Sequence, residues 1–191
     1  MFRTAMQSLR LLLALTLLAG LLYPLTVTGL ARVFFPYRAA GSLVIQDGQV
    51  VGSTLIGQDF TSPRYFHGRP SAAGKGYDAA SSGGSNFGPT SAALIDSVKA
   101  NLARVEKEDP GVTPGMIPVD LVTASASGLD PDISPAAALL QVPRVARARG
   151  IPESEVKKLV FTHIKGRQFG LLGEPRVNVL ELNMALDRLA S

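Results

Sequence analysis

Residues 11–31 read LLLALTLLAGLLYPLTVTGLA, a run of 21 residues without a charge, of which ten are leucine. At 1.5 Å per residue, a helix of that length measures about 31 Å and matches a hydrocarbon core of about 30 Å. Each leucine favours insertion near the bilayer centre by about 0.3–0.6 kcal/mol. The run therefore predicts one membrane-spanning helix, in which Pro24 is accommodated by a local kink.

A cleaved signal peptide is the alternative interpretation of this segment. Residues 11–22 suit the apolar region of a signal peptide, and Gly29-Leu30-Ala31 places small residues where a signal peptidase cleaves. The apolar character continues through Val27 and Leu30 without a polar cleavage region, which favours a retained anchor. Both interpretations export the remainder of the chain.

Arginines flank the span on both sides, Arg3 and Arg10 before it and Arg32 and Arg38 after it. Together with the N-terminal amine they give only a weak preference for a cytoplasmic N-terminus. We therefore expect a short cytoplasmic segment at 1–10, a transmembrane helix at 11–31 and an extracytoplasmic domain at 32–191.

The composition suits one modest domain after the span, because the chain has 191 residues and 46% of them are hydrophobic. The chain has no cysteine, which excludes thiol catalysis, cysteine-ligated zinc and iron–sulfur clusters within it. Three arginines in residues 1–32 account for most of the formal charge of +4. The remaining surplus is too small for a nucleic-acid partner, and none is expected.

Apolar periodicity and turn residues after the span predict strands and helices without βαβ regularity, which indicates an α+β domain. Residues 41–60 predict a β-hairpin that turns at Asp47-Gly48. A segment rich in glycine, serine and proline follows at 61–90. A helix is expected at about 90–107, ended by Asp109-Pro110-Gly111.

The C-terminal part predicts two short strands, at 118–121 and 177–182, and three helices. The first helix begins at Ser134-Pro135 and ends at Gly150, because serine caps, proline starts and glycine stops helices. Pro143 should kink or split it. The second helix opens at Pro152 with an apolar stripe of Val156, Leu159, Val160 and His163, and the third closes the chain at 183–189.

Several motifs suggest ligand binding or catalysis, but each has a simpler explanation. Segment 68–76 lacks the spacing and the hydroxyl residue after Lys75 that a phosphate-binding loop needs, so we expect an exposed loop. Ser125 and Ser127 lack the G-x-S-x-G surroundings of a hydrolase nucleophile. Asp130 and Asp132 are expected to favour the dipole of the following helix rather than to bind a cation.

The remaining polar candidates lie on helices. His163 is expected to be a core or interface histidine, and Arg144 and Arg147 share a helix face that should be solvated or meet the acids of a partner. We therefore predict neither a catalytic residue nor a metal site.

Many short motifs follow one another in a characteristic order. They are Tyr23-Pro24-Leu25, Gly41-Ser42-Leu43, Leu55-Ile56-Gly57-Gln58, Arg69-Pro70-Ser71-Ala72, Tyr77-Asp78-Ala79, Gly84-Ser85-Asn86, Pro118-Val119-Asp120-Leu121, Ser127-Gly128-Leu129-Asp130-Pro131, Ile133-Ser134-Pro135, Arg144-Val145-Ala146 and Val177-Asn178-Val179-Leu180. In this order and over nearly the whole chain, the sequence resembles the C subunit of the Kdp potassium-transporting P-type ATPase of bacteria and archaea.

The resemblance implies a non-catalytic accessory subunit with a retained single span in the bacterial inner membrane. Its implied partners are a channel-like subunit that selects potassium, a P-type subunit that hydrolyses ATP, and the lipid bilayer. The chain lacks the Asp-Lys-Thr-Gly phosphorylation motif, in agreement with a non-catalytic role. The alternative is an exported soluble binding protein or hydrolase, released by cleavage after Ala31.

The resemblance also implies a catalytic chaperone that supports assembly and raises the ATP affinity of the hydrolysing subunit. No cofactor is expected to bind stably, and ATP contact in a ternary complex would involve Ser85 and Asn86. The residues expected at partner interfaces are Arg69, Asp120, Asp130, His163 and Asn178. The chain departs from the family pattern at Asp132, where histidine is expected, and at Pro143.

Overall fold

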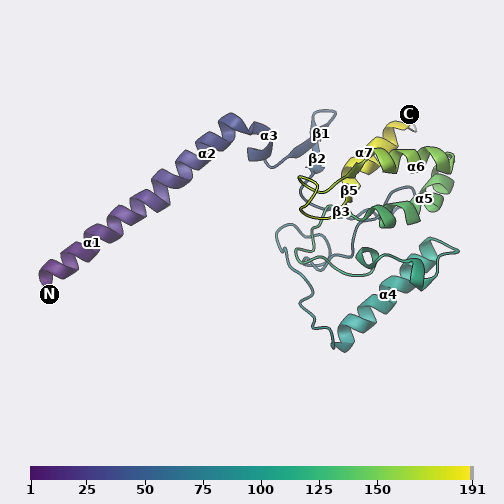
Figure 1. Ribbon diagram of the computed structural model, residues 1–191, viewed down its shortest axis with the longest axis horizontal. Helices are drawn as coiled ribbons and strands as arrows, with labels where there is room; N and C mark the ends of the chain where they lie inside the picture. The colour runs from purple at the N-terminus through teal and green to yellow at the C-terminus, as the bar shows by residue number, and fades with distance from the viewer. Residues whose placement is uncertain (190–191) are drawn as a thin grey trace. The chain divides into compact units, whose positions relative to one another are not determined.

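The structure is a computed structural model that describes residues 1–189. The chain divides into two compact units, Met1–Val51 and a second unit that begins at Gly52 (Figure 1). The first contains the apolar helix, and the second contains the mixed helix and sheet domain. The predicted α+β class is therefore confirmed.

The apolar segment forms one continuous helical run, Phe2–Phe34, of 33 residues with a mean hydropathy of 2.0. It consists of α1 (Phe2–Leu17), a π-helical turn (Leu18–Leu22) and α2 (Tyr23–Phe34). None of its side chains is buried within the chain. By length and composition the run can cross a membrane, and it extends beyond both ends of the predicted span.

The π-helical turn lies directly before Pro24, at the predicted irregularity. Proline has no N–H, so the regular bond to the carbonyl four residues earlier cannot form. The N–H of Tyr23 reaches five residues back to Leu18 O, and Thr26 Oγ1 donates to Leu22 O over 2.7 Å. These bonds keep the backbone satisfied around the proline, as a membrane helix requires.

A short helix, α3 (Pro36–Ala39), and the predicted β-hairpin follow the span. Strands β1 (Leu43–Gln46) and β2 (Gln49–Ser53) pair across a two-residue turn. Asp47 and Gly48 have φ of 51° and 76°, the left-handed conformations that such a turn needs. The hairpin prediction is confirmed.

The second unit is built around a three-stranded antiparallel sheet of order β3-β5-β4. Its strands are β3 (Asp132–Ile133), β4 (Ile164–Lys165) and β5 (Arg176–Asn178). Helices α5 (Pro135–Arg149), α6 (Glu153–Thr162) and α7 (Val179–Leu189) pack together beside it, and α4 (Ala92–Glu108) lies at the other end of the domain (Figure 1). The register pairs Asp132 with Asn178 and Ile164 with Val177.

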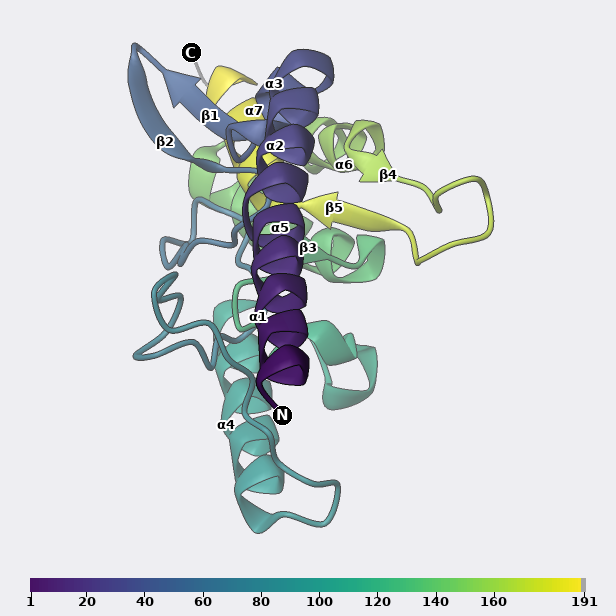
Figure 2. The same cartoon turned by 90° about the vertical axis from the view of Figure 1, so that its left-hand side faces the viewer.

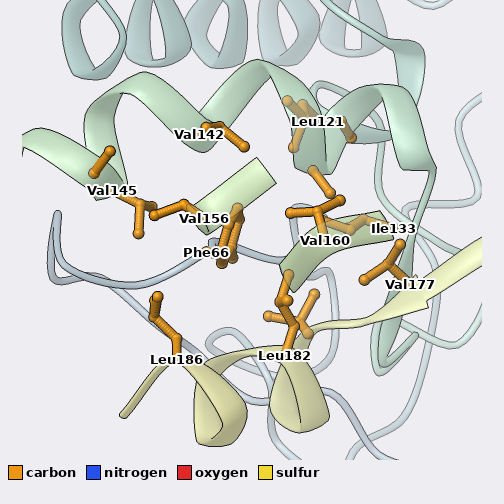
Figure 3. Close-up of a cluster of buried hydrophobic side chains, with 14 of the residues drawn as sticks. Phe66, Leu121, Ile133, Val142, Val145, Val156, Val160, Val177, Leu182 and Leu186 are labelled. Atoms are coloured by element: carbon orange, nitrogen blue, oxygen red, sulfur yellow. The ribbon is translucent and has the colours of Figure 1, made fainter. Parts of the chain in front are cut away.

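The core lies where α5, α6, α7 and the sheet meet, around the fully buried Phe66 (Figure 3). Val145, Val156 and Val160 approach it from α5 and α6, and Leu182 and Leu186 from α7. Burying one such side chain stabilises the fold by about 1.5–3 kcal/mol. Phe66 comes from a long loop, so the core itself holds segment 60–67 in place.

Several sequence predictions require correction. Residues 118–121 form a 3₁₀ turn, Val119–Leu121, and not a strand. The last strand ends at Asn178, because the side chain of Asn178 accepts a hydrogen bond from Glu181 N and so begins α7 there. Pro143 does not split α5, which runs unbroken from its Ser134 cap to Gly150 at φ 70°.

Candidate functional site

Arg69 lines two hollows of the second unit and is the natural starting point for a site. Its Nη1 lies 3.0 Å from Asp130 Oδ2, and its Nη2 donates to the carbonyls of Thr123 and Ala124 over 3.4 Å. Its buried Nε has no hydrogen-bond partner within the described residues. The guanidinium thus fastens segment 69–77 to the loop that carries Asp130.

The backbone around Arg69 is held by a second set of bonds. Ser71 Oγ donates to Gly128 O over 2.6 Å and accepts from Tyr77 N over 2.7 Å. Tyr77 OH donates to Arg69 O over 2.5 Å. Burial, reinforced by the charge of Asp59, raises the pKa of Tyr77 to about 12, so this hydroxyl remains a donor at physiological pH.

An acidic cleft of about 430 Å³ opens on one side of Arg69. Four carboxylates and two guanidinium groups line it: Asp120, Asp130, Asp132 and Glu174, with Arg69 and Arg176. Asp120 accepts from Ser134 N over 2.6 Å and from Ser134 Oγ over 3.2 Å, directly before α5. Asp120, rather than the predicted Asp130 and Asp132, therefore supports the N-terminus of α5.

Asp132 is a sheet residue whose carboxylate has two side-chain partners. It accepts from Asn178 Nδ2 over 3.2 Å and pairs with Arg176 Nε at 2.9 Å. Burial raises the pKa of Asp132, and the neighbouring charge of Asp130 adds to this, although Arg176 opposes it. Asn178 Nδ2 also donates to Thr54 O over 2.9 Å, so Asn178 links the sheet to the start of the unit.

Arg69 also lines a polar hollow of about 340 Å³, together with residues of segment 59–77 and of α4. Its floor includes His67, which is 7% exposed. His67 Nδ1 lies 3.1 Å from Glu108 Oε2, and its Nε2 lies 3.0 Å from Ser62 O. Both ring nitrogens face acceptor oxygens, and Nε2 also lies 3.5 Å from Arg144 Nη1.

The pKa values of Glu108 and Asp109, at the end of α4, are shifted in opposite directions. Burial raises the pKa of Glu108, but the hydrogen bond with His67 and the charge of Arg104 outweigh it, so the pKa lies below its usual 4.5. At Asp109 burial prevails over the attraction of Arg144, and the pKa lies above its usual 3.8.

Arg144 corrects a prediction, because it is buried and not solvated. Its Nε pairs with Asp109, its Nη1 donates to the carbonyls of Pro63 and Tyr65, and its Nη2 donates to Gln141 Oε1 over 2.6 Å. Gln141 in turn bonds both backbone groups of His67. This network ties segment 60–67 to α4 and α5. Arg147, as predicted, is exposed.

The predicted interface residues do not all lie together: most are at the acidic cleft, and one is at the end of α6. Arg69, Asp120 and Asp130 line the acidic cleft, and Asn178 joins it through Asp132. His163 lies elsewhere: it follows the last residue of α6 and is not on its predicted stripe, and its Nδ1 lies 2.8 Å from Leu159 O. The sequence patterns identified neither Tyr77 as a partner of Arg69 nor Glu108, Asp109 and Gln141 as parts of the network around His67 and Arg144.

Ser85 and Asn86, the residues expected near ATP, lie on an exposed loop. Gly83 N and Ser82 Oγ both donate to Ser127 O over 2.9 Å, which anchors the start of this loop. The side chains of Ser85 and Asn86 make no hydrogen bond within residues 1–189 and line neither the acidic cleft nor the polar hollow.

Ser127 and His67, which could suggest catalysis, have structural partners in the second unit. Within residues 1–189, no group of three or more histidine, aspartate or glutamate side chains is arranged to hold a metal ion. Ser125 and Ser127 lie 3.5 Å apart, and Ser127 Oγ accepts from Leu129 N, which makes it a turn residue. The imidazole of His67 is bonded to Glu108 and Ser62 instead of a serine hydroxyl.

Comparisons with known proteins cover almost the entire chain. The family model described as K+-transporting ATPase, c chain, matches residues 5–188. The potassium-transporting ATPase KdpC subunit of Methylobacterium nodulans is 61% identical over 189 residues, covering 93% of this chain and 92% of that protein. The corresponding subunits of Rhodopseudomonas palustris and Bradyrhizobium diazoefficiens are 57% and 54% identical, covering 98% and 100% of both chains.

Proposed function

The chain belongs to the KdpC family, the c chains of K+-transporting ATPases, and from this we propose that it is a non-catalytic accessory subunit of a potassium-uptake ATPase. Its proposed partners are a channel-like subunit that selects potassium and a P-type subunit that hydrolyses ATP. The relatives, all described as KdpC subunits, give no support to an exported soluble binding protein or hydrolase.

The observation that carries the proposal is the unburied apolar helix of a chain whose family assembles into an ATPase. A run of 33 residues with no side chain buried needs lipid or other helices around it. The proposed arrangement has a cytoplasmic N-terminus, a single span and an extracytoplasmic domain. The second unit supplies bonded polar networks, which make the domain rigid.

The second part of the proposal is that the chain raises the ATP affinity of the hydrolysing subunit. Ser85 and Asn86, the residues linked to ATP, lie in the domain proposed to be extracytoplasmic, so they would act through contact with the hydrolysing subunit and not by touching cytoplasmic ATP. Their side chains are exposed and make no hydrogen bond within residues 1–189. ATP itself would be held by the hydrolysing subunit, and this chain would raise the affinity from a distance.

Steady-state ATP hydrolysis by the purified complex tests this role. The double variant Ser85→Ala, Asn86→Ala is expected to raise the KM for ATP while leaving kcat and the subunit composition unchanged. Ser81→Ala, on the same exposed segment, serves as the control and should leave KM unchanged. An unchanged KM in the double variant would remove Ser85 and Asn86 from the proposal, and a KM that does not depend on the presence of this chain would remove the chaperone role altogether.

A further inference from the structure

The connection between β4 and β5, residues 166–175, projects away from the rest of the domain (Figure 2). We refer to it as the β4–β5 finger. Its tip carries three apolar side chains that the domain leaves uncovered: Phe169 is 93% exposed, Leu171 is 80% and Leu172 is 59%. Neighbouring apolar side chains on a projecting tip are a typical feature of an interaction site.

The tip is preformed by its own hydrogen bonds. Gln168 N donates to Leu172 O and Leu172 N donates to Gln168 O, each over 2.9 Å. Phe169 has a φ of 53°, and Gly170, which follows it, has 73°. The left-handed conformation is unfavourable for a bulky residue, and such strain is retained where the side chain serves a purpose. Holding Phe169 on a closed turn reduces the entropy lost on binding.

The base of the finger is closed as well. Arg167 Nη2 lies 2.8 Å from both carboxylate oxygens of Glu174, across the two arms. An exposed ion pair contributes little to stability. Its effect here is to hold the two arms of the finger next to each other. Because β4 and β5 pair Lys165 with Arg176 directly below it, the finger is presented from a sheet and not from a loose loop.

Charge distinguishes a protein partner from a lipid surface. Each basic side chain of the finger and its base is paired within the chain: Lys165 with Glu181, Arg167 with Glu174, and Arg176 with Asp132. No cation there is left for anionic headgroups, which interfacial segments attract with unpaired lysine and arginine. Gly173, Glu174 and Pro175 instead border the acidic cleft, whose lining has a formal surplus of two negative charges.

We propose that the β4–β5 finger docks Phe169 and Leu171 into an apolar socket on another subunit of the ATPase, with basic residues of that subunit facing the acidic cleft beside it. The inference rests on the proposed function, since it requires a second subunit. Preformed aromatic anchors of this kind contribute most of the binding energy at protein interfaces. The finger thus adds Phe169 and Leu171 to the interface residues expected at the cleft.

Site-specific photo-crosslinking in the assembled complex tests the docking partner. A benzophenone amino acid at position 169 should crosslink to one other subunit, and the same probe at Phe161, which is 53% exposed on α6, should give no such product. A crosslink from position 169 only to lipid, only to a second copy of this chain, or to nothing would overturn the proposal. Equal crosslinking from positions 169 and 161 to one subunit would also overturn it, because the contact would then not be specific to the finger.

The variant Phe169→Gly separates docking from folding. Glycine adopts a φ of 53° without strain, so this variant should keep or raise the thermal unfolding midpoint of the chain. It should nevertheless lower retention of the other subunits during tagged purification at least tenfold, whereas Phe161→Ala should retain them. Full retention with Phe169→Gly contradicts the docking proposal. If the wild-type chain itself retains no other subunit, the proposed function fails and not the finger alone.

Discussion

Arg144 and Asp109 form an ion pair inside the domain, with Nε 3.1 Å from Oδ1 and only 5% and 6% of the two side chains exposed. Removing one member of such a pair leaves the other charge buried and unpaired, which costs about 3–5 kcal/mol. Arg144 also holds the carbonyls of Pro63 and Tyr65, so the pair ties the loop before Phe66 to the helices.

We therefore expect Arg144→Met to be strongly destabilising. In a domain of this size it should lower the thermal unfolding midpoint by about 6–20 °C, followed by circular dichroism of the full chain in detergent. Arg147→Met, on the same helix but exposed, is the control and should shift the midpoint by no more than about 2 °C. Equal midpoints for the two variants would contradict the structural role of the ion pair.

Gly128 is predicted to be intolerant of a side chain. Its φ is 67°, and an added Cβ would lie 2.6 Å from both Ala73 N and Gly83 O. Gly128→Ala should cost at least about 2 kcal/mol through backbone strain and overlap, measured as a fall in the unfolding midpoint. Gly115→Ala, where an added Cβ meets nothing within 4 Å, should be nearly neutral, and a similar loss in both variants would refute this explanation.

Protonation of Glu108 should make the fold less stable at acid pH. Its pKa is lower in the folded chain than in the unfolded chain, so its contribution is present above pH 4.5 and is lost as the pH falls through the folded value. Glu108→Gln should remove that part of the dependence, because glutamine does not titrate. Unfolding midpoints measured from pH 6 down to about pH 3 for both proteins test this. Parallel curves would show that Glu108 contributes nothing.

Tyr77 should act at the alkaline end with the opposite sign. Its pKa rises from 10.0 in the unfolded chain to about 12 in the folded chain. Its contribution is therefore complete below pH 10.0 and decreases as the pH rises towards 12. Tyr77→Phe should lack this decrease between pH 10 and about pH 12 while losing the bond to Arg69 O at every pH. An identical alkaline decline in both proteins would exclude Tyr77 as its source.

Local signals in the sequence predicted much of the fold. The apolar run, the Asp47-Gly48 turn and the Ser134 cap with its Gly150 stop each depend on neighbouring residues, and each is found where expected. The final strand was predicted too long because apolar residues 177–182 suit either a strand or a buried helix. Asn178, three residues before Glu181, is a helix-capping signal and favours the helix.

The candidate site was predictable only in part, because its bonds join residues far apart in the chain. Arg69 reaches Asp130 across 61 positions, and Arg144 reaches Asp109 across 35. Periodicity indicates which face of a helix is apolar, but not which distant carboxylate a guanidinium meets. The exposed side chains of the finger were missed for the same reason, since Phe169 and Leu171 have an ordinary core composition until the structure shows them uncovered.

Purification of the full chain through a C-terminal tag, in mild detergent from its native membrane, tests the central claim most directly. The account predicts that a P-type ATPase subunit and a multi-span channel-like subunit are recovered with it in fixed proportion, and that the chain retains residues 1–31. Recovery of the chain alone, free of membrane and lacking residues 1–31, would contradict the account.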